Sequence, residues 1–204
     1  GSAVCTEFIN QGWDVIGVDV TDSSLDLHRF EYADLSEVDA ISKLHDRLSD
    51  LQQVNAIVNN AAICLNKSAI ETTDEEWQRT FDINVRSAFQ MIRSFHHHLL
   101  LAKGSIVNVS SVHSSATTAH LSAYAASKGA LTALTRAIAM EYAPDGIRCN
   151  AVLPGAVNTS MLQSGLSRLG DKNLPQENFE ALESAIPLNF IANPDQIAPT
   201  IVHL

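Results

Sequence analysis

Tyr124 and Lys128 form a pair whose types and spacing suggest catalysis. They stand four residues apart, so on a helix both side chains project from one face, one turn apart. A free tyrosine has a pKa of about 10 and is a poor base at neutral pH, but a neighbouring ammonium group stabilises the phenolate. Lowering that pKa to about 7 takes about 4 kcal/mol. The spacing therefore predicts a proton-exchanging tyrosine of lowered pKa, although a surface lysine beside a core tyrosine fits it equally.

Two more polar residues are expected near this pair. Ser111 directly follows the apolar run 105–110, at the carboxyl end of a predicted strand, which is where open parallel sheets bind their ligands. Asn84 lies seven residues after Trp77, on or beside the apolar stripe of a predicted helix, where an unpaired amide would be costly. Asn84 is therefore either a hydrogen-bonded polar residue of the core or a residue that holds a water molecule at the site.

The elements that would position these residues alternate in type along the chain. Short runs rich in valine and isoleucine alternate with longer segments of helical period, the pattern of βαβ units around a parallel sheet. The predicted strands are 13–19, 55–60, 105–110 and 147–152, with a weaker candidate at 29–32. The sequence therefore predicts one α/β domain over residues 1–204, with a doubly wound parallel sheet and helices on both of its faces.

Capping boxes and apolar stripes predict the helices. The segment 36–39 is a capping box expected to open a helix with Val38, Ile41, Leu44, Leu48 and Leu51 on one face. A second capping box, 73–76, opens a long helix to about residue 101, whose apolar stripe is Trp77, Phe81, Val85, Ala88, Ile92, Phe95 and Leu99. Helices are also predicted at about 122–142 and from 194 onward. The segment 160–194 has weak periodicity and is predicted to be an irregular cover over the site.

Charge and composition exclude several classes of protein. The 204 residues are 46% hydrophobic and 18% charged, which are values of a globular protein. A formal charge of −10 repels polyphosphate, so no nucleic-acid partner is expected, and no apolar run approaches the about 20 residues of a membrane span. The three cysteines have no metal-ligand spacing. A reduced, cytoplasmic protein without a metal site is expected.

The histidines need separate consideration. His96, His97 and His98 have the composition of a metal site, but neighbours on a helix point about 100° apart and cannot converge on one ion. They are predicted to form a solvated helix end. His113 lies between Ser111 and Tyr124, on a segment expected to border the site, and both a substrate contact and a plain loop position are open for it.

Taken together, these residues resemble the motifs of the short-chain dehydrogenase/reductase family. The resemblance runs along essentially the whole chain. Its motifs, in order, are Asn59-Asn60-Ala61-Ala62, Asn84, Ser111, Tyr124-Ala125-Ala126-Ser127-Lys128 and Pro154-Gly155. It implies a Rossmann-like fold and an oxidoreductase that transfers a hydride between a nicotinamide cofactor and a secondary alcohol or ketone. The alternatives are an NADP-dependent enzyme similar to 3-oxoacyl reductases, or a truncated family member without catalytic activity.

The resemblance also implies which residues bind the cofactor. Asp19 would accept hydrogen bonds from the adenosine ribose and repel a 2′-phosphate, and the segment 20–24 offers no cation to hold one. NAD is therefore favoured over NADP. The other implied cofactor positions are Asp34 and Leu35 at the adenine, Asn60, Ala61 and Ala62 in the turn after a strand, and Pro154, Gly155, Val157 and Thr159 toward the carboxamide. Ala62 replaces the glycine that is usual in the family.

The implied mechanism gives each catalytic residue a role. Tyr124 exchanges the proton of the substrate hydroxyl, Ser111 binds the substrate oxygen, and Lys128 binds the cofactor ribose and keeps Tyr124 acidic. Asn84 would order a water molecule that passes protons outward. Substrate contacts are expected from Ser111 and Tyr124, with His113 as a further candidate, and specificity is expected mainly in 161–187. The two long helices resemble the family's subunit interface, so a homo-oligomer, a dimer or tetramer, is expected.

The resemblance makes the chain look truncated at both ends. The family begins with a strand and a glycine-rich turn, and residues 1–4 align with the end of that turn. The family's first strand would lie between the strands that end at Asp19 and Asn60, and its last strand would follow the final helix. Both strands are therefore expected to be missing, with unpaired strand edges as the result.

Overall fold

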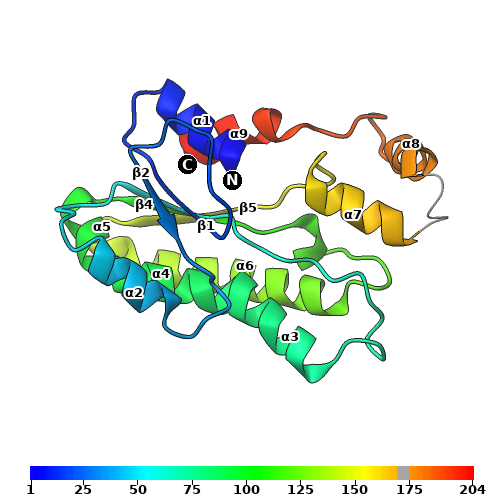
Figure 1. Ribbon diagram of the computed structural model, residues 1–204, viewed down its shortest axis with the longest axis horizontal. Helices are drawn as coiled ribbons and strands as arrows, with labels where there is room; N and C mark the ends of the chain where they lie inside the picture. The colour runs from blue at the N-terminus through cyan, green and yellow to red at the C-terminus, as the bar shows by residue number, and fades with distance from the viewer. Residues whose placement is uncertain (170–174) are drawn as a thin grey trace.

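The computed structural model describes residues 1–169 and 175–204 and has a Rossmann-like α/β fold (Figure 1). Its strands are β1 (Ile16–Asp19), β2 (Arg29–Tyr32), β3 (Ala56–Asn59), β4 (Ser105–Val109) and β5 (Arg148–Val152). All pairings between them are parallel. Every predicted strand is therefore confirmed: the weaker one has the predicted bounds, and each of the others is shorter than predicted by one to three residues.

The strands form two sheets. One has the order β1–β2 and the other the order β3–β4–β5, and within the described residues no ladder joins β1 to β3. The division lies where the family resemblance places a further strand. The two sheets share apolar contacts, because Ile16 and Val18 of β1 pack against the cluster that contains Ile57 of β3 and Ile106 of β4.

Helices cover both faces of the strands, as predicted (Figure 1). Successive side chains of β4 point to opposite faces, so Ile106 and Val107 enter different cores. Ile106 packs against α2 (Ala40–Arg47), α4 (Ser87–Ser94), α5 (His96–Ala102) and α6 (Ser122–Tyr142). Val107 packs against α1 (Ser2–Asn10) and α9 (Pro194–His203).

The long helix predicted over about 74–101 is interrupted. Its start is confirmed, because Thr73 and Glu76 form the reciprocal capping box at the head of α3 (Asp74–Phe81). A π-helix, η1 (Asp82–Arg86), then separates α3 from α4, and α5 follows after Phe95. Beyond this π-turn the predicted apolar stripe is buried at Ala88, Ile92, Phe95 and Leu99. Trp77, predicted to be apolar core, is 41% exposed.

Two further expectations are wrong. The capping box predicted at 36–39 does not form, because the Ser36 hydroxyl bonds the carboxylate of Asp34 at 2.7 Å, and α2 begins only after Asp39. Val38 therefore lies outside the helix and is 73% exposed. The segment 160–194 was expected to be irregular, but it holds α7 (Ser160–Leu169) and α8 (Pro175–Ala185).

The helix predicted at about 122–142 and its end agree with the structure. Helix α6 is continuous, and the 3-10 turn η3 (Ala143–Asp145) follows it and ends at Gly146, whose φ of 76° suits glycine. None of the described helices is both long enough and apolar enough to cross a membrane.

Candidate active site

Helix α6 carries Tyr124 and Lys128 into the interior at the carboxyl end of β4. Both side chains are buried, and Lys128 is only 2% exposed. The Lys128 ammonium group donates a hydrogen bond to the Val109 carbonyl of β4 at 2.7 Å and lies 5.7 Å from the centre of the Tyr124 ring. The predicted helical spacing therefore brings the two groups together.

Ser111 completes this group from the strand side. It follows β4 and precedes the 3-10 turn η2 (Val112–Ser114), where its hydroxyl accepts a hydrogen bond from the His113 backbone N–H at 3.2 Å. Its side chain is also close enough to the Tyr124 hydroxyl to act on the pKa of that tyrosine. The structure thus joins Ser111, Tyr124 and Lys128, three residues that the sequence placed in one site.

The charge states of the pair differ from the expectation. The sequence predicted a lowered Tyr124 pKa, but burial raises it, because desolvation disfavours the charged phenolate. The Ser111 side chain acts in the opposite direction and lowers it in part. Burial also lowers the pKa of Lys128 to about 8. Both side chains are thus pushed toward their neutral forms, because burial affects the acid and the base alike.

Asn84 is held within a network of hydrogen bonds. It lies in the π-helix η1 and is 2% exposed. Its side-chain oxygen accepts from the Ile63 N–H at 2.8 Å, while its amide nitrogen donates to the Ile63 carbonyl and to the Ser127 hydroxyl, both at 2.9 Å. The two amide hydrogens are therefore engaged. This arrangement matches the hydrogen-bonded core residue, which the sequence left as one of two readings for Asn84.

Ser127 belongs to the motif at 124–128, and the family resemblance implies no role for it. Its side chain is completely buried, and its hydroxyl donates to the Tyr124 carbonyl at 2.7 Å while it accepts from Asn84. It therefore links the π-helix to the helix that carries Tyr124. The signal available in the sequence was a serine one position before Lys128, on the buried side of a helix rich in small residues.

The residues assigned to the adenosine end lie on two elements. Asp19 is exposed at the end of β1, where its carboxylate accepts one hydrogen bond, from the Thr21 N–H at 3.0 Å. The Asp34 carboxylate accepts hydrogen bonds from the backbone N–H and the hydroxyl of Ser36. These bonds, the hydroxyl bond most of all, lower the pKa of the Asp34 carboxyl. Leu35 packs against the core. Asp19 therefore has more free capacity than Asp34 to accept hydrogen bonds from a ligand.

The turns assigned to the rest of the cofactor adjoin the catalytic group. Asn60, Ala61 and Ala62 follow β3 directly, beside the central strand β4. Gly155 follows β5, and a Cβ atom there would meet no atom within 4 Å, so the space beside it is open. The Pro154 carbonyl accepts from the Val112 N–H at 3.1 Å, which ties this turn to the residue after Ser111.

Val157 and Thr159 are engaged in local structure. Val157 forms a bridge with Ala192, and the Thr159 hydroxyl accepts from the Leu162 N–H at 3.3 Å at the start of α7. The sequence assigned the Thr159 hydroxyl to the cofactor. In the structure this hydroxyl caps a helix that the sequence did not predict.

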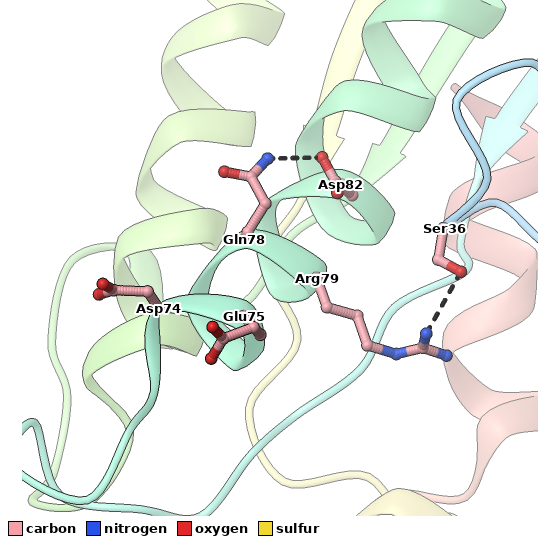
Figure 2. A pocket seen from close by; sticks show the side chains of 6 residues that line it. All are labelled: Ser36, Asp74, Glu75, Gln78, Arg79 and Asp82. Carbon is pink, nitrogen blue, oxygen red and sulfur yellow. Dashed lines mark hydrogen bonds between the residues drawn. The ribbon is translucent and has the colours of Figure 1, made fainter.

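Two cavities lie near this region. One, of about 510 Å³, lies between the turn after β3, helix α3 and helix α7, and Ala62, Cys64, Arg79 and Met161 are among its lining residues. Figure 2 shows the other, of about 500 Å³, which is lined by polar side chains of α3, by Asp82 and by Ser36, to which Arg79 donates a hydrogen bond at 3.3 Å. The first cavity adjoins the predicted site residue Ala62, and the second contains none of the predicted site residues.

The three neighbouring histidines do not form a solvated end. His96 lies 3.2 Å from the Asp145 carboxylate, and the His98 ring packs edge-on against His45, whereas only His97 is exposed. Residues from other elements contact His96 and His98, and helical spacing alone could not indicate these contacts. Across residues 1–169 and 175–204, no three histidine, cysteine or acidic side chains are grouped to hold a metal ion.

Comparison with known proteins agrees with this geometry. The family described as "Enoyl-(Acyl carrier protein) reductase" matches residues 1–204. The chain is 36% identical over 169 residues to 3beta-hydroxysteroid dehydrogenase 1 of Eggerthella lenta, covering 81% of this chain and 62% of that protein. It is 33% identical over 221 residues to 2-(R)-hydroxypropyl-CoM dehydrogenase of Xanthobacter autotrophicus, covering all of this chain and 86% of that protein. The chain thus spans about three fifths of the first relative's length.

A solved structure extends the agreement to the fold. The crystal structure of a short chain dehydrogenase family protein from Francisella tularensis superposes with a TM-score of 0.93 at 28% identity, covering all of this chain and 85% of that one. The matches in sequence and fold run through the strands and helices that join Ser111, Tyr124 and Lys128. The chain therefore belongs to the short-chain dehydrogenase/reductase family of oxidoreductases.

Proposed function

We propose that this chain is the catalytic part of an NAD-dependent dehydrogenase that interconverts a secondary alcohol and its ketone. The observation that carries the proposal is the contact group of Ser111, Tyr124 and Lys128 at the carboxyl end of β4. The names of two relatives support the reaction class, since one is a hydroxysteroid dehydrogenase and the other a hydroxypropyl-CoM dehydrogenase.

Tyr124 is the proton-transfer residue in this proposal. Its raised pKa keeps the hydroxyl protonated, so it is ready to donate its proton to a ketone oxygen. In the oxidation direction Tyr124 accepts the alcohol proton, and the buried ammonium group of Lys128 stabilises the phenolate that acts as base. Ser111 shares the substrate oxygen with Tyr124 and fixes its position. When bound, the nicotinamide cofactor supplies or accepts the hydride.

The residues present fit a dinucleotide. An ammonium group has three hydrogens, and Lys128 donates one to Val109, so ribose hydroxyl groups can receive the others. The open space beside Gly155 and the turn at Asn60, Ala61 and Ala62 border the same group. With Asp34 and Leu35, and with Pro154, Val157 and Thr159, these residues make up the proposed cofactor site.

The exposed carboxylate of Asp19 supports NAD as the cofactor. It offers acceptors to ribose hydroxyl groups and would repel a 2′-phosphate. The residues that follow, 20–24, supply no lysine or arginine to offset that repulsion.

Asn84 is a positioning residue in this proposal. Its amide clamps Ile63 in the segment after β3 and Ser127 beside Lys128, so it fixes two walls of the site relative to each other. One lone pair of its side-chain oxygen remains to bind a water molecule, which is the role that the family resemblance implies.

A homo-oligomer is proposed as the working form. Trp77, Phe89 and Leu101 of the α3–α5 segment and Met140 of α6 are exposed apolar side chains. Exposed apolar groups on neighbouring helices are typical of subunit interfaces. Sedimentation of the full-length protein at micromolar concentration tests this, and a monomer would contradict it.

Turnover tests the function as a whole. The full-length protein is supplied with NAD or NADP and a panel of secondary alcohols, and the reduced cofactor is followed by absorbance. We expect NAD reduction with at least one alcohol and its loss in Tyr124→Phe. Turnover that survives unchanged in that variant, or no turnover with any alcohol or its ketone, would contradict the proposal.

A further inference from the structure

His113 lies directly beside the catalytic group but has no part in the chemistry derived above. Its backbone N–H donates to the Ser111 hydroxyl at 3.2 Å, and its ring packs edge-on against the Tyr124 ring with centres 6.0 Å apart. The His113 backbone is therefore bonded to Ser111, and its ring packs against Tyr124. These are the two residues that would hold the substrate oxygen. A substrate bound between Ser111 and Tyr124 lies next to this imidazole.

The hydrogen bonds of the ring assign its tautomer. Nδ1 lies 3.1 Å from the Thr117 hydroxyl oxygen, and the Thr117 hydroxyl donates its hydrogen to the Thr118 carbonyl at 3.4 Å. The Thr117 hydroxyl has one hydrogen, and both contacts are satisfied when it donates to the Thr118 carbonyl and accepts from the ring, so we assign the ring proton to Nδ1. Nε2 then carries a lone pair, and within the described residues it has no hydrogen-bond partner.

The ring also stays neutral at physiological pH. Burial lowers the pKa of His113 below its ordinary value, and no carboxylate contributes to the shift. A neutral ring with its proton on Nδ1 can only accept a hydrogen bond at Nε2. Such a nitrogen can accept a hydrogen bond from a hydroxyl group. It cannot donate one to a carbonyl, a carboxylate or a phosphate.

We propose that Nε2 of His113 accepts a hydrogen bond from a second hydroxyl group of the substrate, next to the carbon that is oxidised. This inference rests on the proposed function, and it narrows the substrate class to secondary alcohols with a neighbouring hydroxyl, such as vicinal diols. The two rings are in contact, so the oxygen that reaches His113 lies close to the oxygen held by Tyr124. That closeness favours a hydroxyl on the adjoining carbon.

A matched set of substrates tests the inference. Cyclopentanol and the cis and trans isomers of cyclopentane-1,2-diol share one ring and differ in the second hydroxyl. With the full-length protein and NAD, kcat/KM is measured for all three. We expect the wild type to favour one diol isomer over cyclopentanol, and His113→Phe to lower that diol-to-cyclopentanol ratio three- to tenfold, the value of one ordinary hydrogen bond.

Two further variants separate recognition from packing. His113→Gln places an amide oxygen near the position of Nε2 and is expected to recover part of the diol preference. Thr117→Val removes the partner that fixes the tautomer of His113. The diol-to-cyclopentanol ratio is therefore expected to fall, but by less than in His113→Phe. NAD binding to each variant, followed by fluorescence, shows that the fold is intact.

The outcomes distinguish the two proposals. Turnover of cyclopentanol without a diol preference, or a ratio that His113→Phe leaves unchanged, overturns the role of His113 and leaves the proposed dehydrogenase standing. Equal losses in His113→Phe and His113→Gln also overturn it, since packing alone would then explain the effect. No turnover of these three or of any other secondary alcohol overturns both.

Discussion

The sequence predicts helix α6 as one long helix, and it predicts the segment from α3 to α5 as another. Helix α6 is continuous over Ser122–Tyr142, whereas the other segment contains a π-turn and a break at Phe95. In α6 the proposed site residues Tyr124 and Lys128 lie at the i, i+4 spacing of an ordinary helix. In the other segment the important side chain, Asn84, lies within the irregular turn itself.

The two regions differ in how their polar groups are satisfied. Tyr124 and Lys128 interact close to the reacting centre, with Ser111 and the Val109 carbonyl. Asn84 bonds to Ile63, 21 residues away, and to Ser127, 43 residues away. Under the proposed function, α6 supplies the reacting groups and the π-turn fixes their position. Substitutions in α6 should therefore reduce the rate, and substitutions in the π-turn should first reduce stability.

The largest effect is expected from Tyr124→Phe. Removing the hydroxyl removes general acid–base catalysis, so kcat should fall by about 10²- to 10⁴-fold while NAD binding persists. Steady-state kinetics of the full-length protein measures the change, and Tyr142→Phe at the far end of the same helix is the control. If Tyr124→Phe kept more than about a tenth of the activity, Tyr124 would not be the proton-transfer residue.

Asn84→Ala should mainly affect folding. It removes three hydrogen bonds and leaves the Ile63 backbone groups without their partner, so the free energy of unfolding should fall by about 2–4 kcal/mol. Urea denaturation measures this loss. Gln78→Ala removes one exposed hydrogen bond to Asp82 in the same segment and should cost less than about 0.5 kcal/mol. Equal losses in both variants would argue against the positioning role.

Lys128 is expected to make stability depend on pH in the alkaline range. Below about pH 8 the ammonium group is charged in both states, and its full burial penalty is present. Between about pH 8 and 10.5 the folded lysine loses its proton before the unfolded one, so the unfolded state binds more protons and stability rises with pH. The expected gain, relative to Lys128→Met, is about 3 kcal/mol.

Urea denaturation of the wild type and Lys128→Met at several pH values between 7 and 11 measures that difference. Using the difference cancels the opposite trend of other buried groups, such as the Cys149 thiol, whose pKa burial raises to about 12. A constant difference across the range would mean that Lys128 is not desolvated. NADH formation by Lys128→Met should be strongly reduced, since the tyrosine loses its neighbouring charge.

The smallest predicted effect concerns the cofactor. Asp19→Ala combined with Val20→Arg removes a repulsive carboxylate and adds a cation, so the ratio of kcat/KM for NAD over NADP should fall about tenfold or more. Asp22→Ala, an exposed acidic residue in the same loop, is the control and should leave the ratio nearly unchanged. A wild type that already uses NADP better would refute the role of Asp19.

Local patterns in the sequence predicted much of the fold and the core of the site. The spacing of Tyr124 and Lys128 and the capping box at Thr73 are short-range features, and both are present in the structure. The strands followed from their valine and isoleucine runs. These features depend on neighbours a few residues away, so a single sequence contains their signal.

The features that were missed have both distant and local causes. The π-turn at Asn84 leaves the period of apolar residues almost unchanged, so periodicity could not reveal it. The capping box at Ser36 failed because Asp34 competed for the serine hydroxyl. The raised pKa of Tyr124 comes from burial, which is set by how the whole chain packs around α6. At Tyr124 tertiary structure overrides a local pattern, whereas at Ser36 one local contact replaces another.

The division of the strands into two sheets has a mechanical consequence. Asp19 belongs to the β1–β2 sheet, whereas Val109, which holds Lys128, ends the central strand of the other. Within the described residues the two sheets are in contact through apolar packing. A ligand bound to Asp19 and Lys128 at once would act as a cross-link between them. Amide hydrogen exchange should then slow along β1 and β3 when NAD binds, and change least in β4, which is paired on both sides.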